Sequence, residues 1–380
     1  MSRRGARGQG PEAGEAISNF SKAALFLLAV GVAALWLPAA RADDISPEYR
    51  KAIDKGLEWL AKGQHRDGHW STTGEQYPTA MTALSGMALL MEGSTIRDGR
   101  YADNIRRAVD WFMDHSQRNG LLGPNQGGRG YMHDHGYGLL FLASLYGEEE
   151  DGDRRRKLEG LLTRAVEFTG KAQTPRGGWG YVSSTEGGGF DEGSVTVTQV
   201  QALRAARNAG IVVPKSIIDK AHQYLKDCTT SNGGVIYSLA QGNGAAMGGE
   251  RPALTAAAIA SLFSAGEYNS PLAMKWLKYC QRAIPIAAAG RTGHDEYTQY
   301  YYAQALYMLG DKGFEKVFPD SHEGERLTWS RYRKATYDYL IRTQSGDGSW
   351  QSGYIGPVFA TAVNLAILQL DNGTLPIYQR

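Results

Sequence analysis

The chain has 380 residues, of which 42% are hydrophobic, 21% charged and 10% aromatic. This composition excludes a disordered chain, a collagen-like chain and a membrane protein with many spans, because it can bury a large core and lacks repeated long apolar runs. The formal net charge is +2, but residues 1–42 hold five basic and two acidic side chains, so the rest is nearly neutral. We therefore expect no nucleic-acid partner.

The first 42 residues have the organisation of an export signal. A basic, polar opening leads into an apolar run over residues 23–37, which is short for a membrane span, and Ala40 and Ala42 are typical of a cleavage site. We predict a signal peptide at residues 1–42 and a periplasmic or extracellular location. An uncleaved anchor, which would be the only membrane contact, and a start codon placed too far upstream are the alternatives.

Apolar, alanine-rich stretches recur along residues 43–380, and each is followed by a glycine. These glycines, spaced 44 to 63 residues apart, are Gly93, Gly147, Gly210, Gly266, Gly310 and Gly373. The stretches are apolar on nearly all sides, which predicts buried helices that end at a glycine. A more amphipathic stretch with an aromatic residue near its end precedes each of them and predicts an outer helix.

The expected fold is therefore all-α: a single domain over residues 43–380, built as an α/α toroid of six outer–inner helical hairpins. Stacked hairpins can also form an open superhelix. A closed ring buries apolar inner helices better when the sequence shows no polar capping repeat.

Three loops share the spacing Q-x-x-x-G-x-W, and each follows a predicted outer helix. Their first and last residues are Gln64 and Trp70, Gln173 and Trp179, and Gln344 and Trp350. The motif resembles the QW repeat of the prenyltransferase and squalene-oxidase repeat family, to which the squalene cyclases belong. The resemblance implies a terpenoid cyclase-like toroid in which these glutamines tie helix ends and the tryptophans stack nearby, so we expect structural roles for all six.

The catalytic signatures of that family do not carry over. The D-x-D-D string of class II terpenoid cyclases is absent from the sequence. The zinc set of protein prenyltransferases is incomplete, since Asp295 and Tyr297 stand at the aspartate and cysteine places and the next inner helix begins without a histidine. A different metal site, made from His133, Asp134, His135 and His294, is less expected than structural or solvated imidazoles. We expect no cofactor and no bound metal.

A toroid brings the starts of its inner helices together at one mouth, where two predicted helices begin with both imidazoles and carboxylates. The candidate catalytic residues are His133, Asp134, His294 and Asp295. Repeats two and five would face each other across the ring, so a bound molecule could meet an acid on one side and a base on the other. In the alternative, the two aspartates cap their helices and the histidines fill the rim.

Two functions stay open at this point. The first is an exported toroid that binds a small-molecule ligand, apolar or glycan-like, in its central cavity without catalysis. The second is a divergent enzyme that uses the carboxylates and histidines of the mouth, either a terpenoid cyclase-type isomerase or transferase or a polysaccharide lyase. An aromatic, dry cavity would favour isoprenoids, and a polar cavity with charged subsites would favour sugars.

Overall fold

The computed structural model describes residues 45–124, 130–187, 189–242, 245–246, 249–286, 295–351 and 355–379. The predicted signal peptide lies outside these ranges. Within them the chain is helical, apart from isolated bridges and a short antiparallel pairing of β1 (Gln241–Gly242) with β2 (Ala245–Ala246). No helix among the described residues is long and apolar enough to cross a membrane.

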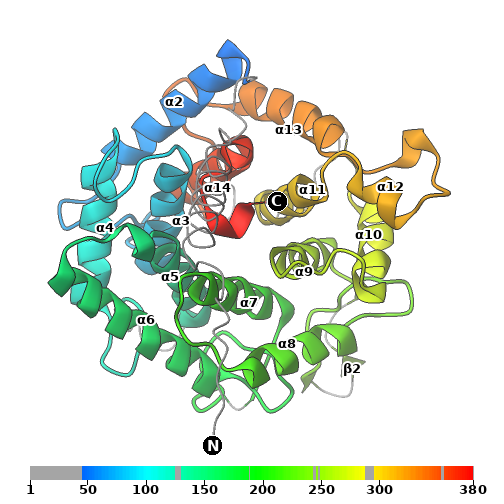
Figure 1. Ribbon diagram of the computed structural model, residues 1–380, viewed down its shortest axis with the longest axis horizontal. Coiled ribbons are helices and arrows are strands. Elements are labelled where there is room, and N and C mark those ends of the chain that lie inside the picture. The colour runs from blue at the N-terminus through cyan, green and yellow to red at the C-terminus, as the bar shows by residue number, and fades with distance from the viewer. Residues whose placement is uncertain are drawn as a thin grey trace, which may run out of the picture. The chain divides into compact units, whose positions relative to one another are not determined.

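The helices of residues 45–380 form two concentric rings (Figure 1). The outer ring contains α2 (Pro47–Lys62), α4 (Ala102–His115), α6 (Gly152–Ala172), α8 (Lys215–Asp227), α10 (Pro271–Ala283) and α13 (Trp329–Thr343). The inner ring contains α3 (Pro78–Met91), α5 (Tyr131–Leu145), α7 (Gly193–Asn208), α9 (Pro252–Ser264), α11 (Asp295–Leu309) and α14 (Pro357–Leu368). The short elements α12 (Gly313–Val317), η1 (Tyr146–Glu148), η2 (Glu323–Glu325), η3 (Leu370–Asn372) and η4 (Pro376–Tyr378) lie between or after them.

The inner ring is closed. Each inner helix packs against the next along the chain, and α14 contacts both α11 and α3. Side chains join the last repeat to the first: Gln369 Nε2 donates to Ala88 O at 3.0 Å, and Asn372 Nδ2 donates to Met91 O at 2.9 Å. The arrangement is therefore a toroid and not an open superhelix.

The inner helices are buried on all sides and the outer helices on one face, as the apolar patterns of their sequences predict. Every residue of α3 is buried, which explains its apolar character on all sides. In α2 the buried side chains recur at helical spacing on one face, at Ile53, Leu57 and Leu60, and the opposite face is exposed. Burying a large apolar side chain stabilises the fold by about 1.5–3 kcal/mol, so these faces dominate the packing.

The first motif loop, residues 64–70, ties two repeats together. The buried ring of Trp70 donates its Nε1–H to Leu60 O at the end of α2, at 2.7 Å. The side-chain amide of Gln64 donates both within the loop, to Gly68 O at 2.7 Å, and to Asn104 O of the next outer helix, at 2.9 Å. A single loop therefore fixes the end of its own helix and the position of the following one.

The other two motif loops repeat these contacts. Trp179 Nε1 donates to Thr169 O and Trp350 Nε1 to Leu340 O, each at 2.8 Å. Gln173 Nε2 bonds Ile217 O of α8 at 2.9 Å, and Gln344 Nε2 bonds Ala52 O of α2 at 2.8 Å. The contact of Gln344 joins the last outer helix to the first, so the motif also closes the outer ring.

The glycine of the motif is required by its conformation and by its neighbours. Gly68 has a φ of +102°, and a Cβ added there would lie 2.2 Å from the backbone oxygen of Arg107. Gly177 and Gly348 show the same left-handed φ, +99° and +98°, and the same close approach to the backbone of an outer helix. A side chain at any of these positions would push neighbouring repeats apart.

Candidate functional site

A cavity of about 890 Å³ opens where the inner helices begin. Its wall includes residues from the first turns of several inner helices, such as Met81 of α3, Ser194 of α7, Tyr297 of α11 and Phe359 of α14. The inner helices therefore start at one end of the ring. The loops before them close the rim, where Tyr181 and Tyr237 are joined through their hydroxyls.

Most of the cavity wall is apolar or aromatic. Besides the residues already named, the lining aromatic side chains are Tyr77, Tyr137 and Phe190. Below the cavity the hydroxyls of Tyr137 and Tyr301 approach to 3.4 Å, and Tyr300 and Tyr378 bond at 2.9 Å. Buried tyrosines therefore fill the centre of the ring, and a separate cavity of about 390 Å³ lies at the end where α3, α5 and α7 terminate.

His133 lies in the wall with 24% of its side chain exposed. Its Nε2 is 2.9 Å from Ser194 Oγ, and that hydroxyl donates to Glu192 Oε1 at 2.6 Å. Because the serine proton is used by the glutamate, we assign the proton on the imidazole to Nε2, which leaves Nδ1 as the basic atom. Burial lowers the pKa of His133 to about 4, so the ring is neutral at pH 7.

Asp134, the next residue of α5, also lines the cavity. Only 7% of it is exposed, and burial raises the pKa of its carboxyl to about 7. At neutral pH a large fraction of Asp134 is therefore protonated and able to donate a proton. A neutral acid beside a neutral imidazole is the chemical pairing that general acid–base catalysis uses.

Glu192 and Asp191 do not line the cavity, although they start an inner helix. The carboxylate of Glu192 accepts from the backbone N–H groups of Ser194 and Val195 at 2.7 and 2.8 Å, which caps α7. Asp191 accepts from Arg176 Nε at 2.7 Å, in the second motif loop. Both are buried, and their contacts hold the loop and the helix start.

His135 lies two residues after His133 on α5, so the two side chains leave the helix on nearly opposite faces. His135 therefore points away from the cavity. Its Nδ1 accepts from the backbone N–H of Leu122 at 3.2 Å, and its Nε2 donates to Thr169 Oγ1 at 2.9 Å. Burial lowers the pKa of His135 to about 4. His133 and His135 consequently cannot share a metal ion, and the mouth site that would have combined them does not form.

The second half of the predicted catalytic group is only partly described. His294 lies outside the described residues. Asp295 is the first residue of α11, and its side chain is likewise outside the description. The start of α11 does lie in the inner ring. Because the side chains of His294 and Asp295 are not described, the expectation that they face His133 and Asp134 stays a prediction.

Three groups that the predicted catalytic set does not contain also lie in the cavity wall or near it. Ser194 links His133 to Glu192, and Arg251 lies in the cavity wall with its guanidinium 6.0 Å from the ring centre of Tyr237. The third group, His65, His69 and Glu75, collects in and beside the first motif loop. Its histidines occupy variable positions of the motif, a departure from the other two copies that the sequence already displays.

The comparisons with known proteins concern the fold. No protein-family model matches the sequence, and the search of curated proteins found no match. One similar structure is an inactive variant of the alpha-1,6-mannanase GH76A of Salegentibacter sp. HEL1_6 with alpha-1,6-mannotriose, at a TM-score of 0.60 and 10% identity, covering 86% of this chain and 99% of that one. Another is a variant of type II terpene cyclase MstE from Scytonema with geranylgeranyl dihydroxybenzoate, at a TM-score of 0.56 and 14% identity, covering 86% and 98%. The chain is thus similar to toroids of two unlike activities, and the predicted all-α, toroid fold is confirmed.

Proposed function

We propose that this protein is an exported toroid that binds an elongated apolar small molecule in its central cavity. The observation that carries the proposal is the wall of the 890 Å³ cavity, which is dominated by aromatic and aliphatic side chains over a floor of buried tyrosines. Burial keeps His133 neutral and a large fraction of Asp134 protonated, so Arg251 is the main fixed charge among the described lining residues. Such a lining suits an isoprenoid-like chain better than a charged sugar polymer.

The cavity also has a polar side, which sets the expected orientation of the ligand. His133, Asp134 and Ser194 lie together at the starts of α5 and α7, and Arg251 lies at the start of α9. A ligand with a polar head and an apolar tail would place the head against these groups and the tail against Phe359 and Leu84. Glycan-like ligands are the competing class, since the similar mannanase structure is a complex with alpha-1,6-mannotriose.

Binding of both ligand classes to the full chain tests the proposal. Titration calorimetry with a C15–C20 isoprenoid alcohol and, separately, with an alpha-1,6-linked mannotriose should show binding of the isoprenoid only. Ala253→Phe adds a ring to the cavity wall and should weaken binding by about tenfold or more, because a filled pocket excludes the tail. Val212→Phe, at a residue 84% exposed, is the matched control and should bind like the wild type. Equal binding by both variants, or binding of mannotriose alone, contradicts the proposal.

A second candidate function is an acid–base enzyme of the same cavity. The protonation of Asp134 favours this enzyme function. Burial raises the pKa of its carboxyl to about 7, and the neighbouring residue His133 is neutral. Asp134→Asn keeps the shape and removes the proton donor. If wild type converts an isoprenoid and Asp134→Asn binds it without turnover, the enzyme assignment stands; if wild type converts none of the terpenoid and polysaccharide substrates, the binding function remains.

Export of the protein rests on the pattern of residues 1–42 and is part of the same proposal. Cleavage after Ala42 would make Asp43 the first residue of the mature chain. Intact-mass measurement of the protein recovered from outside the cytoplasm checks this. A mass that retains residues 1–42 would indicate an anchor.

A further inference from the structure

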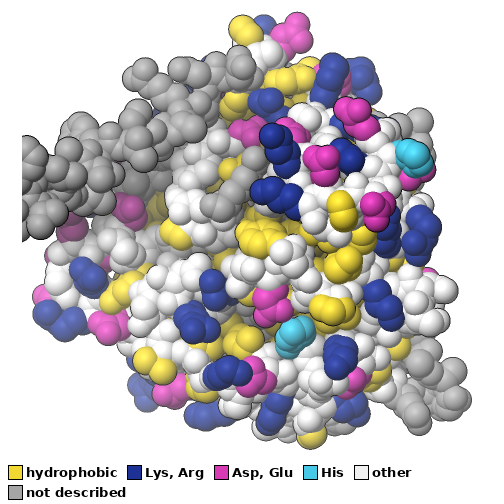
Figure 2. Space-filling view, turned by 45° about the vertical axis from the view of Figure 1, so that its right-hand side comes forward, with side chains coloured by type: hydrophobic (Ala, Val, Ile, Leu, Met, Phe, Trp, Pro, Cys, Tyr) yellow, Lys and Arg dark blue, Asp and Glu magenta, His cyan; other side chains and the backbone are white. Residues whose placement is uncertain are grey.

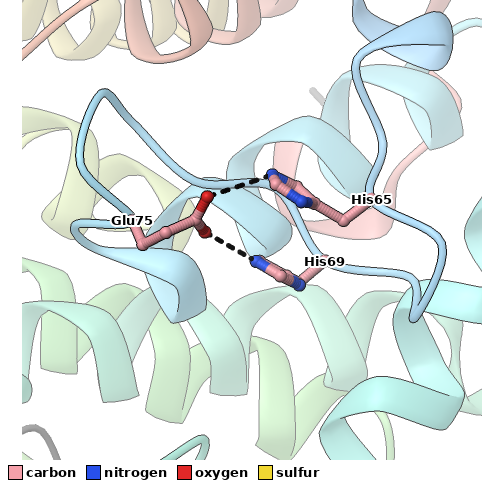
Figure 3. A group of neighbouring side chains, drawn as sticks. All are labelled: His65, His69 and Glu75. Carbon is pink, nitrogen blue, oxygen red and sulfur yellow. Dashed lines mark hydrogen bonds and ion pairs between the residues drawn. The ribbon is translucent and has the colours of Figure 1, made fainter.

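A cluster of two histidines and a glutamate lies outside the central cavity wall. His65 and His69 belong to the first motif loop, and Glu75 belongs to the short hairpin before α3 (Figure 3). One nitrogen of each imidazole and one carboxylate oxygen all lie within 4.8 Å of one another. In Figure 3 the carboxylate of Glu75 points toward both rings.

The motif turn places the two imidazoles side by side. The backbone N–H of His65 donates to His69 O at 2.8 Å, and the rings stack with centroids 4.2 Å apart and planes 9° apart. The other two motif loops make the same backbone bond without histidines, from Thr174 to Gly178 and from Ser345 to Ser349, each at 2.9 Å. The turn therefore does not need imidazoles, and their presence here is additional to the fold.

His69 is held so that a lone pair faces the carboxylate. Its Nδ1 is 2.7 Å from Asp67 Oδ1, and its Nε2 is 3.3 Å from Glu75 Oε2. When Nδ1–H donates to Asp67, Nε2 and the glutamate oxygen both present lone pairs to each other. That contact is favourable only if a proton or a metal cation lies between them. A carboxylate that orients a histidine through its other nitrogen is a typical outer partner of a metal ligand.

The remaining contacts complete a three-sided donor set. Glu75 Oε1 lies 4.0 Å from His65 Nε2. Ser71 Oγ donates to Glu75 Oε2 at 2.8 Å, so His65 Nε2–H donates to Ser71 Oγ at 3.2 Å, and a metal ion bound at this nitrogen would replace that proton. Glu75 adopts a left-handed φ of +56°, which residues other than glycine rarely do.

We propose that His65, His69 and Glu75 bind a divalent transition-metal ion, with zinc as the ion that fits the donors best. Zinc bonds of about 2.0 Å in a tetrahedron separate neighbouring ligand atoms by about 3.3 Å. His69 Nε2 lies 3.3 Å from Glu75 Oε2, and His65 Nε2 lies 4.0 Å from the other oxygen, Oε1. One ligand atom of each residue lies within 4.8 Å of the others, so side-chain rotations must draw the three atoms together around the ion. Glu75 and His65 are 68% and 40% exposed, so a fourth position faces solvent.

The metal would act on the rim of the central cavity. The hairpin of residues 72–76 is closed by a bridge between Thr72 and Gln76, and Tyr77, the next residue, lines the cavity. A metal bound to Glu75 would hold this hairpin against the motif loop. This assignment is independent of what the cavity binds, because all three ligands lie outside its wall.

The test uses the full chain, stripped with a chelator and titrated with zinc chloride in a calorimeter. Wild type should bind one equivalent of zinc and gain thermal stability, and magnesium should not compete, because it prefers all-oxygen sites. The double variant His65→Ser/His69→Ser introduces the residues that the third motif loop has at the same positions, Ser345 and Ser349. This double variant should fold and melt like the stripped wild type but lose stoichiometric zinc binding.

Three further variants test the third ligand, the outer partner of His69 and an unrelated histidine. Glu75→Gln should also lose the site, and Asp67→Asn should weaken zinc binding by about 10–100-fold, as loss of an outer partner does. His222→Ser, on outer helix α8, removes an unrelated imidazole and should bind like wild type. If the His65/His69 double variant binds zinc as tightly as wild type, the site is elsewhere. If wild type binds no zinc, a proton and not a metal joins His69 to Glu75; either result overturns the proposal.

Discussion

The Nδ1 atom of His135 accepts the backbone N–H of Leu122 at 3.2 Å, in a place that threonine hydroxyls hold in other repeats. The corresponding acceptors are Thr82 for Trp70, Thr196 for Trp179, Thr255 for Val235 and Thr361 for Trp350. Each bond runs from the loop to the first turns of an inner helix. His135 is therefore a structural residue of the repeat, although it stands beside the cavity residues His133 and Asp134.

Replacing His135 with threonine or valine should separate the hydrogen bond from the packing. The two side chains have nearly the same shape, but only threonine can accept the N–H of Leu122. We expect His135→Val to be less stable than His135→Thr by about 1–3 kcal/mol, the cost of a buried donor without a partner. Urea unfolding of both variants at pH 7.5 measures the difference. Equal stabilities would show that the bond to Leu122 contributes nothing.

Asp134→Asn should stabilise the protein more at high pH than at low pH. Burial raises the pKa of Asp134 from 3.8 to about 7, so the folded state holds its proton while the unfolded state has lost it. Its contribution to stability is complete below pH 3.8 and is lost as the pH rises through 7. The advantage of the asparagine variant should grow by about 2–3 kcal/mol between pH 5 and pH 8. Unfolding at both pH values tests this, and a constant difference would show that Asp134 is ionised throughout.

His135 should have the opposite pH dependence. Burial lowers its pKa to about 4, so the unfolded state takes up a proton below pH 6.5 that the folded state refuses until about pH 4. The wild type should consequently lose stability across this window on acidification, and His135→Thr should lose about 2–3 kcal/mol less between pH 7.5 and pH 4.5. Parallel losses in both proteins would place the acid sensitivity elsewhere.

Replacing any one of the motif tryptophans with alanine should lower the free energy of unfolding by about 3–5 kcal/mol, as for other large buried side chains. Trp70, Trp179 and Trp350 are buried and hydrogen-bonded to the end of an outer helix. Thermal melts of the three single variants check the value. Unchanged melting together with altered ligand binding would mean that these positions serve function and not structure.

Gly68→Ala should destabilise the fold far more than Gly74→Ala. Both glycines have a left-handed φ, +102° and +77°, so both variants bear the conformational cost of about 1 kcal/mol or more. Only at Gly68 would the new Cβ collide with a neighbouring backbone, 2.2 Å from Arg107 O, whereas nothing lies within 4 Å at Gly74. The difference in unfolding free energy between the two variants measures the collision. Equal effects would mean that the loop simply moves away from α4.

The sequence predicts the fold well because the fold depends on repeated local patterns. Apolar periodicity separates inner from outer helices, and the Q-x-x-x-G-x-W spacing marks loops whose contacts recur from copy to copy. The site is harder to predict because it depends on which face of a helix meets the cavity. His133 and His135 look alike in the sequence, yet one lines the wall and the other packs behind it. Likewise, the stacking of His65 on His69 follows from a backbone turn that residue types alone do not reveal.

Closure of the ring affects how cooperatively this repeat protein unfolds. In an open superhelix, removing a terminal repeat exposes one new surface and leaves the rest intact. Here α14 packs against both α11 and α3, and Gln344 and Gln369 bond the first repeat. Removing α13 and α14 would therefore expose two surfaces at once, one on each side of the gap. Unfolding should accordingly be a single cooperative event, without the stepwise fraying from the ends that open repeat arrays show.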